Sequence, residues 1–204
     1  MNQFSLTIAT RNSHKTKEIQ EILGPEFTVQ DLSANSDVPD IAETGKTFEE
    51  NAILKAVAVS QRVSGLVLAD DSGLEVDALN GAPGVYSARY ARSGNDRDNV
   101  QKLLQELERV DSGKQRREAR FQCVLAVACN GKLLKTFAGM IAGTITDYPR
   151  GSHGFGYDPV FVPNGFTQTF SELPAQQKNQ LSHRGRALAA AIPFLQTQKP
   201  EAEK

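Results

Sequence analysis

The sequence is poor in the residues that mark disulfide-stapled and membrane-spanning proteins. Its two cysteines, Cys123 and Cys129, lie in one apolar run. On a β-strand they would point to the same face about 20 Å apart, which is too far for a disulfide. That run, residues 123–129, is the longest strongly apolar one and is much too short to cross a bilayer. We therefore expect both cysteines to be packing residues in a reducing compartment, and we expect no contact with a membrane.

The sequence also lacks a large excess of charge of either sign. Lys and Arg number 23 and Asp and Glu number 24, so the formal net charge of −1 gives no general attraction for nucleic acid. The three histidines, His14, His153 and His183, have no metal-ligand spacing, and a zinc site is not expected. The first residues lack a cationic start followed by an apolar stretch, so the sequence predicts a cytoplasmic protein without a secretory signal.

The apolar residues that are present suffice for one buried core. For 204 residues, surface scaling predicts that about 70% of the chain's surface is buried on folding. Apolar periodicity favours a mixed α/β fold with parallel and antiparallel pairing. Asn130-Gly131 is typical of a type I′ hairpin turn. The predicted strands are 4–9, 27–32, 66–69, 120–129 and 132–141, the helices 13–23, 47–63, 95–110, 174–180 and 182–195, with a long loop at 73–94 and a polar tail at 197–204.

Two polar segments follow the first and third predicted strands. Residues 10–15 lead into a helix N-terminus, where free N–H groups and two basic side chains favour phosphate; an ordinary helix cap is the alternative. Asp70 and Asp71 are adjacent carboxylates at a strand end, and a positive partner such as Mg²⁺ would relieve their repulsion. Because strand neighbours point opposite ways, the two need not share one role. An acidic turn is the alternative interpretation.

Other polar residues gather at helix starts and in a glycine-rich loop. Thr47 and Glu50 form a capping box, and Asn51 and Lys55 lie one turn further on; on this pattern alone we favour a solvated face for that pair. In residues 151–158 glycines alternate with aromatics that could stack on a flat ligand, or form a tight packed turn. Lys178 and residues 182–184 offer another anion site. Together these segments predict one site for phosphate, a divalent cation and a planar base.

In their order along the chain, these motifs resemble those of the inosine triphosphate pyrophosphatase family. The resemblance extends from Leu6 to about Leu195, and the ordered series of ungapped blocks makes chance agreement very improbable. The blocks are Thr10-x-Asn12-x-x-Lys15, Glu43-Thr44-Gly45-x-Thr47-Phe48-x-Glu50-Asn51-Ala52, Asp70-Asp71-Ser72-Gly73-Leu74, Gly81–Tyr90, Gly154–Pro159 and Ser182-His183-Arg184.

The resemblance implies a fold, an activity and a set of site residues. It implies one elongated, two-lobed α/β domain, residues 1–196, around a curved mixed sheet with the site in a central cleft. It also implies a homodimer that hydrolyses dITP, ITP and XTP with Mg²⁺ to a nucleoside monophosphate and pyrophosphate. Asp71 would be the general base or a metal-binding acid, and Glu43 and Asp70 the other metal-associated carboxylates. The substrate-binding positions would be Thr10, Arg11, Asn12, Ser13, His14, Lys15, Lys55, Ser72, Phe155, Gly156, Tyr157, Asp158, Lys178, His183 and Arg184.

The resemblance also suggests how the purine base is selected and shows where this chain departs from the family's pattern. Hypoxanthine and xanthine have a 6-keto acceptor that adenine lacks, so donors from His183, Arg184 or backbone amides would leave adenine unsatisfied. Arg11, His14 and His153 stand where many members have glycine. We expect these bulkier residues to tune the site without abolishing it.

Two other function classes compete with this interpretation. A nucleotide sensor on the same fold would bind ITP without releasing pyrophosphate, and the acidic residues argue against it. Nucleic-acid binding would use the basic cluster Arg116, Arg117 and Arg120, for which a solvated surface is the favoured interpretation.

Overall fold

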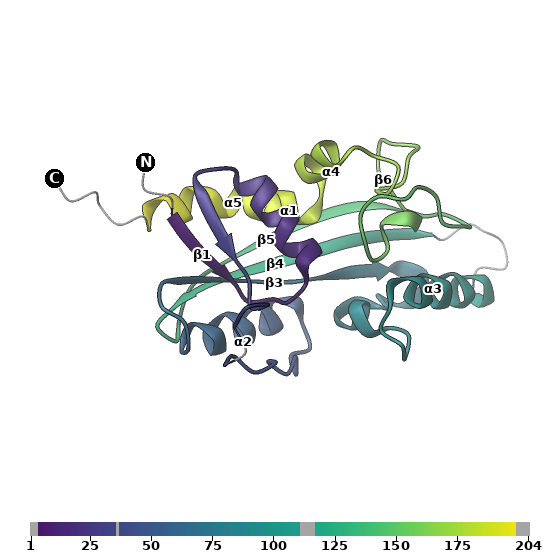
Figure 1. Cartoon of the computed structure of the whole chain (residues 1–204). Helices are drawn as coiled ribbons and strands as arrows, with labels where there is room; N and C mark the ends of the chain where they lie inside the picture. The colour runs from purple at the N-terminus through teal and green to yellow at the C-terminus, as the bar shows by residue number, and fades with distance from the viewer. Residues whose placement is uncertain (1–3, 36, 111–116, 199–204) are drawn as a thin grey trace. The chain divides into compact units, whose positions relative to one another are not determined.

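A computed structural model describes residues 4–35, 37–110 and 117–198. It has the mixed α/β architecture expected from the sequence, with one six-stranded sheet of order β2-β1-β3-β4-β5-β6 (Figure 1). No helix in these described ranges is long and apolar enough to cross a membrane. The strands are β1 (Phe4–Ile8), β2 (Phe27–Gln30), β3 (Leu66–Val76), β4 (Glu118–Cys129), β5 (Lys132–Ile145) and β6 (Phe161–Pro163). The helices are α1 (Ser13–Leu23), α2 (Phe48–Ser60), α3 (Asp96–Val110), α4 (Ala175–Leu181) and α5 (His183–Thr197), with 3₁₀ turns η1 (Asp77–Leu79), η2 (Gly84–Arg89) and η3 (Asp158–Val160).

The chain forms two compact units. The first contains the described residues of Met1–Asp71, Val124–Gly139 and Arg184–Lys204, and the second those of Ser72–Cys123 and Met140–His183. Both Cys123, which is buried, and Cys129 are free thiols.

The first unit is built on parallel strands. β1 pairs with β2, where Phe4 lies opposite Phe27, and with β3, where Leu6 lies opposite Leu66. Helices α1 and α5 lie on one side of these strands and α2 on the other (Figure 1). Because both faces are covered, Leu6, Ile8 and their neighbours in β3 are fully buried. The parallel arrangement brings the carboxyl ends of β1 and β3 to one edge, where the predicted phosphate loop and the two aspartates lie.

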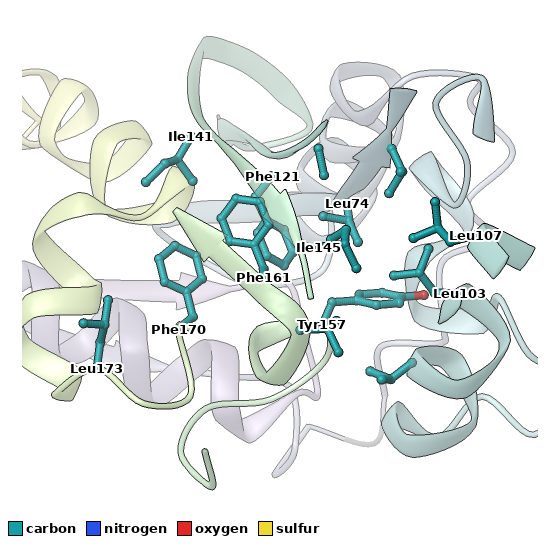
Figure 2. Packing of buried hydrophobic residues seen from close by; sticks show 14 residues of the cluster. Leu74, Leu103, Leu107, Phe121, Ile141, Ile145, Tyr157, Phe161, Phe170 and Leu173 are labelled. Atoms are coloured by element: carbon teal, nitrogen blue, oxygen red, sulfur yellow. The ribbon is translucent and has the colours of Figure 1, made fainter. Parts of the chain in front are cut away.

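The second unit has its own apolar core (Figure 2). Phe121 of β4 meets Phe161 of β6 edge to face, with ring centroids 4.8 Å apart. Phe170 packs against both rings, and Leu103 and Leu107 of α3 belong to the same cluster. Edge-to-face and offset aromatic contacts stabilise a core beyond the apolar area that they bury.

The predicted hairpin between β4 and β5 is confirmed. Asn130 and Gly131 have positive φ values of 50° and 75°, as a two-residue type I′ turn requires. β5 extends to Ile145, past residue 141, where the predicted strand ended.

Several boundaries differ from the prediction, among them the end of β3 and the end of α5. β3 runs to Val76, so the expected loop at 73–94 begins later and contains η1 and η2. Asp70-Asp71-Ser72-Gly73 has turn composition, but distant cations and a neighbouring strand hold it extended, which local composition cannot show. α5 continues through Thr197, the first residue of the expected tail, and residues 199–204 of that tail lie outside the described ranges.

Candidate active site

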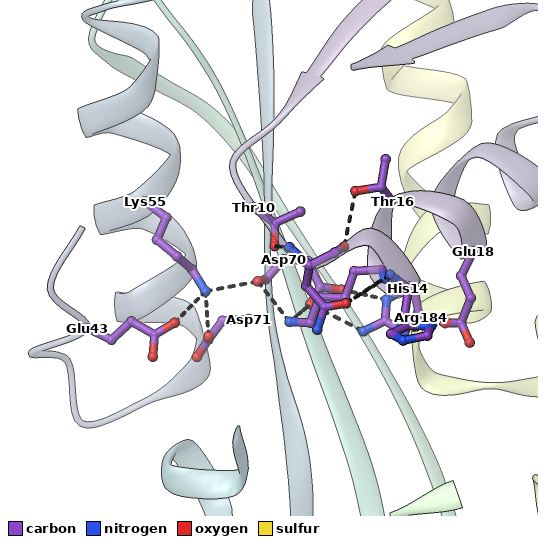
Figure 3. Close-up of polar contacts among 11 residues, drawn as sticks. Thr10, His14, Thr16, Glu18, Glu43, Lys55, Asp70, Asp71 and Arg184 are labelled. Atoms are coloured by element: carbon purple, nitrogen blue, oxygen red, sulfur yellow. Dashed lines mark hydrogen bonds and ion pairs between the residues drawn. The ribbon is translucent and has the colours of Figure 1, made fainter. Parts of the chain in front are cut away.

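Asp70 and Asp71 are adjacent buried residues of β3 that contact different partners (Figure 3). Successive side chains of a strand point to opposite faces. The two carboxylates therefore have separate ion-pair partners: that of Asp71 contacts α2, and that of Asp70 contacts α1 and α5.

One ammonium group joins the first set of oxygen atoms. Lys55 Nζ of α2 donates to Asp71 Oδ1 at 2.6 Å, to Glu43 Oε1 at 2.9 Å and to the carbonyl oxygen of Asp70 at 3.0 Å. Burial by itself lowers the pKa of Lys55, but Asp71 and Glu43 outweigh burial and raise it. Burial raises the pKa of Asp71, and Lys55 offsets that effect only in part. Asp71 is therefore a better proton acceptor than an ordinary exposed aspartate.

The second set of contacts surrounds Asp70. Its carboxylate accepts from Lys15 Nζ at 2.6 Å and from Arg184 Nε at 2.9 Å, and Arg184 Nη1 also contacts Glu18 at 2.5 Å. Burial alone raises the pKa of Asp70, but Arg184 and Lys15 outweigh burial and hold the pKa well below its usual range. Both carboxylate oxygens of Asp70 are engaged by these cations, and metal binding by Asp70 stays a prediction. The guanidinium of Arg184 is likewise paired with Asp70 and Glu18, so it is not available to donate a hydrogen bond to a purine base.

Several polar groups of residues 10–15 are already hydrogen-bonded within the protein. Asn12 is the N-cap of α1, and its side chain accepts from the backbone N–H groups of His14 and Lys15. Arg11 binds Asp40 at 2.6 Å and the carbonyl of Val38 at 2.5 Å, so it holds the segment after β2. The predicted anion site therefore has fewer open backbone donors than expected. Ser13 and His14 are exposed, while Thr10 is half-buried and accepts from the Asn12 N–H.

The second unit contains the aromatic group of predicted residues. Lys178 Nζ lies 2.5 Å from Asp158 Oδ2 and 5.1 Å from the centroid of the Phe155 ring. Asp158 also accepts from the Phe155 N–H at 2.9 Å. A buried ammonium ion, its carboxylate and a half-buried aromatic ring thus form one cluster, in which ring and cation also attract each other.

Tyr157 has a different environment from the one predicted for it. Its ring belongs to the apolar core and its hydroxyl donates to the Ser87 carbonyl at 2.9 Å (Figure 2). The prediction that this ring stacks on a ligand is not met, because the ring is 4% exposed. Burial raises the pKa of its phenol.

The remaining predicted residues also lie in the second unit. His183 is buried and its ring stacks on Phe121 at 4.6 Å, nearly parallel. Ser72 is half-buried directly after Asp71, and the Gly156 N–H donates to Asp96 at 2.7 Å. A pocket of about 870 Å³ is lined by α3 and by segment 147–159, including Phe155 and Gly156. Its size is that of small-molecule sites.

The oxygen atoms around Lys55 test whether Mg²⁺ fits this chain. Two carboxylates and one carbonyl oxygen already converge on a single positive group, the ammonium of Lys55, and hard oxygen donors suit Mg²⁺. In the described part of the chain no group of three or more His, Cys, Asp or Glu side chains could hold a metal. The protein therefore offers Glu43 and Asp71, and substrate phosphates and water would complete a Mg²⁺ shell.

Three residues of this region were missed or misjudged from the sequence. Glu18 was missed because its partner is Arg184, 166 positions away, and no local pattern links the two. Asn51 and Lys55 were interpreted as a solvated face; Asn51 is completely buried and the Lys55 side chain is 12% exposed.

The two described residues of the predicted basic cluster are both paired. Arg117 pairs with Asp147 and Arg120 with Glu75 and Asp77, while Arg116 lies outside the described ranges.

Comparisons with known proteins agree on one family. A sequence model of the Ham1 family matches residues 6–194. The dITP/XTP pyrophosphatase of Bacillus subtilis (strain 168) is 49% identical over 183 residues, which cover 89% of this chain and 91% of that protein. The protein of the same name from Geobacter sulfurreducens is 51% identical over 187 residues, or 90% and 92% of the two chains.

Solved structures show the same likeness. The Ham1 protein of Coxiella burnetii has a TM-score of 0.84 at 42% identity, covering 96% of this chain and all of that one. The Ham1 protein of Staphylococcus aureus has a TM-score of 0.82 at 40% identity with the same coverage.

Proposed function

The chain belongs to the Ham1 family, and on that premise we propose that it is a dITP/XTP pyrophosphatase. It hydrolyses non-canonical purine nucleoside triphosphates, dITP, ITP and XTP, to the nucleoside monophosphate and pyrophosphate, and so removes them from the nucleotide pool. The observation that carries this proposal is the pair of lysines, Lys15 and Lys55, held by separate aspartates of one strand.

Each lysine could bind a phosphate group, because another positive group can balance the charge of the aspartate that it now contacts. Asp70 keeps Arg184 when Lys15 turns to a phosphate oxygen. Asp71 and Glu43 would hold Mg²⁺ in place of the Lys55 ammonium, which leaves that ammonium for the substrate. Charge-assisted bonds from lysine to phosphate are about twice as strong as neutral hydrogen bonds.

Cleavage of a phosphoanhydride needs charge neutralisation and a positioned water. Bound Mg²⁺ supplies Lewis-acid stabilisation of the phosphate oxygens. Asp71, a carboxylate beside Glu43 and Lys55, accepts the proton of the attacking water. Lys15 and Lys55 orient the triphosphate, so that the linkage between the α- and β-phosphates is the one exposed to that water.

Base selection is assigned to the group Phe155, Asp158 and Lys178. The Phe155 ring offers a stacking surface, and the Lys178 ammonium is a donor for the 6-keto oxygen that adenine cannot provide. A buried donor left without its acceptor costs enough to reject adenine strongly. Backbone N–H groups of the glycine-rich loop and His183 are further candidates for base contacts.

Pyrophosphate release tests the activity directly. With dITP, XTP, dATP and dGTP at equal concentration, we expect release from dITP and XTP at rates at least about a hundredfold above that for dATP, which lacks the 6-keto acceptor, and we expect slower release from dGTP, which carries a 2-amino group. Binding of dITP without any pyrophosphate would instead identify a nucleotide sensor. Equal rates on all four would remove the specificity claim.

The variant Asp71→Asn tests the role of the base. It keeps the size of the side chain and removes the carboxylate, so we expect pyrophosphate release from dITP to fall by about 10²-fold or more. Asp37→Asn, which changes an exposed carboxylate, is the matched control and should leave turnover unchanged. A folded Asp71→Asn protein with wild-type turnover would contradict the assignment.

The proposal includes three expectations about the protein's setting. It works as a homodimer, uses Mg²⁺ and acts in the cytoplasm, where the nucleotide pool lies. A single domain of two lobes with a central cleft remains a prediction from the resemblance.

A further inference from the structure

Asn51 of α2 is a buried amide next to the proposed metal carboxylates. Its Oδ1 accepts from the backbone N–H of Gly45 at 2.8 Å, and this donor identifies which end of the amide is the oxygen. Its Nδ2 has no hydrogen-bond partner among the residues that the structure describes. A leucine of similar size would avoid that unsatisfied Nδ2 donor but would leave the Gly45 N–H without its acceptor, so the bond to Gly45 is the contact that an asparagine provides here.

The bond to Gly45 belongs to a set that fastens segment 43–47 to the first turns of α2. Glu50 accepts from the N–H groups of Lys46 at 2.6 Å and of Thr47 at 3.2 Å. Three successive backbone N–H groups are therefore held by two neighbouring side chains of the helix. The segment that they hold begins at Glu43.

Gly45 allows this contact to be close. A Cβ atom at position 45 would lie 2.7 Å from Asn51 Oδ1 and 2.7 Å from Glu50 Cβ. Any side chain would push the segment away from the helix, and Glu43 is only two residues from that point. The carboxylate of Glu43 then reaches Lys55, one turn beyond Asn51 on the same helix.

We infer that Asn51 is a positioning residue for the metal site: its bond to Gly45 fixes the backbone that places the Glu43 carboxylate beside Asp71. This inference rests on the proposed Mg²⁺-dependent function. Asn51 acts through Glu43 and touches neither substrate nor metal. Residues that orient a ligand in this way typically contribute ten- to hundredfold in metal affinity or activity.

The test compares Asn51→Leu with Val59→Ala, a truncation of another buried side chain of α2. We expect the Mg²⁺ concentration for half-maximal dITP cleavage to rise by about tenfold or more in Asn51→Leu and to stay unchanged in Val59→Ala. At saturating Mg²⁺, the KM for dITP changes little. Mn²⁺ binding followed by electron paramagnetic resonance, with no turnover, should weaken by the same factor.

Two further measurements separate positioning from general damage. Amide hydrogen exchange at Gly45 should accelerate in Asn51→Leu without metal, because its acceptor is gone. Gly45→Ala, which disturbs the same contact and leaves the helix side chains intact, should raise the Mg²⁺ requirement in the same way and also serves if Asn51→Leu does not fold.

A double-variant cycle with Glu43→Gln decides whether the effect passes through Glu43. We expect Asn51→Leu to cause no further loss of Mn²⁺ affinity in the Glu43→Gln background. Losses that multiply, or a wild-type metal response in Asn51→Leu and Gly45→Ala, would overturn the inference alone. Wild-type cleavage of dITP that needs no divalent cation would overturn the proposed metal role as well, so the two failures are distinguishable.

Discussion

Two adjacent aspartates acquire different chemistry from their partners. Asp71 has one buried cation, Lys55, which a second carboxylate shares, and the pKa of Asp71 is raised because burial outweighs that single ion pair. Asp70 has both Arg184 and Lys15, and its pKa is held well below the ordinary value although the side chain is fully buried. The number of buried cations, rather than burial, therefore separates a proton acceptor from a permanent counterion.

The ion pairs of Asp70 make a prediction about acid stability. Unfolding returns the Asp70 carboxyl to its ordinary pKa of 3.8, so the unfolded chain takes up a proton first as the pH falls. The stability that ionised Asp70 contributes is therefore fully present above about pH 5 and is lost progressively below about pH 4. We expect Asp70→Asn to lower the free energy of unfolding by about 3–5 kcal/mol near pH 7, and this difference should shrink below about pH 4.

Urea unfolding of wild type and Asp70→Asn at a series of pH values measures this. Asp37→Asn, a change at an exposed carboxylate, should leave stability unchanged throughout. A difference between wild type and Asp70→Asn that is equally large at about pH 3 would show that the ionised carboxylate is not its source.

At the scale of elements, α2 holds the segment and side chains around Glu43 and Asp71. Its first turn has the full capping box, in which Thr47 accepts from the Glu50 N–H and Glu50 accepts from the Thr47 N–H. The helix then presents Asn51 and Lys55 to the segment that carries Glu43. The start of this helix is therefore both a local stability determinant and part of the site's framework.

Thr47→Ala tests the cap. It removes the oxygen that accepts the Glu50 N–H, and we expect the free energy of unfolding to fall by about 1 kcal/mol, seen as a lower Tm by calorimetry. Ser5→Ala removes an exposed hydroxyl from β1 and should change the Tm very little. If both variants lost the same amount, the cap would have no special contribution.

At the scale of the molecule, we expect two copies of the chain to associate. The proposed homodimer needs an apolar surface, and Tyr86 in η2 is a large side chain that is 60% exposed. It lies in the segment Gly81–Tyr90, which the sequence marks as glycine- and aromatic-rich. We expect sedimentation at micromolar concentration to give twice the chain mass of 22.2 kDa.

Tyr86→Ser should shift that equilibrium toward the single chain, because a buried aromatic is lost from the interface. Tyr148→Ser, at a site that is 65% exposed, is the matched control and should leave the mass unchanged. A 22.2 kDa species in the wild type would contradict the dimer.

Local pattern in the sequence sufficed for much of this protein. The strand β1, the helix α1 over Ser13–Leu23, the capping box of α2 and the Asn130-Gly131 turn depend on residues within a few positions of one another, and all four predictions are confirmed. The family and its chemistry were also evident from ordered motifs.

Only the tertiary structure determined which polar side chains are available to a ligand and which are already paired within the protein. Asp70 and Arg184 are 114 positions apart, Tyr157 and Ser87 are 70 apart, and Arg11 and Asp40 are 29 apart. No local pattern contains such partners. Because a buried charge is stable only when it is paired, these long-range partners determine whether a side chain binds a ligand or holds the fold together.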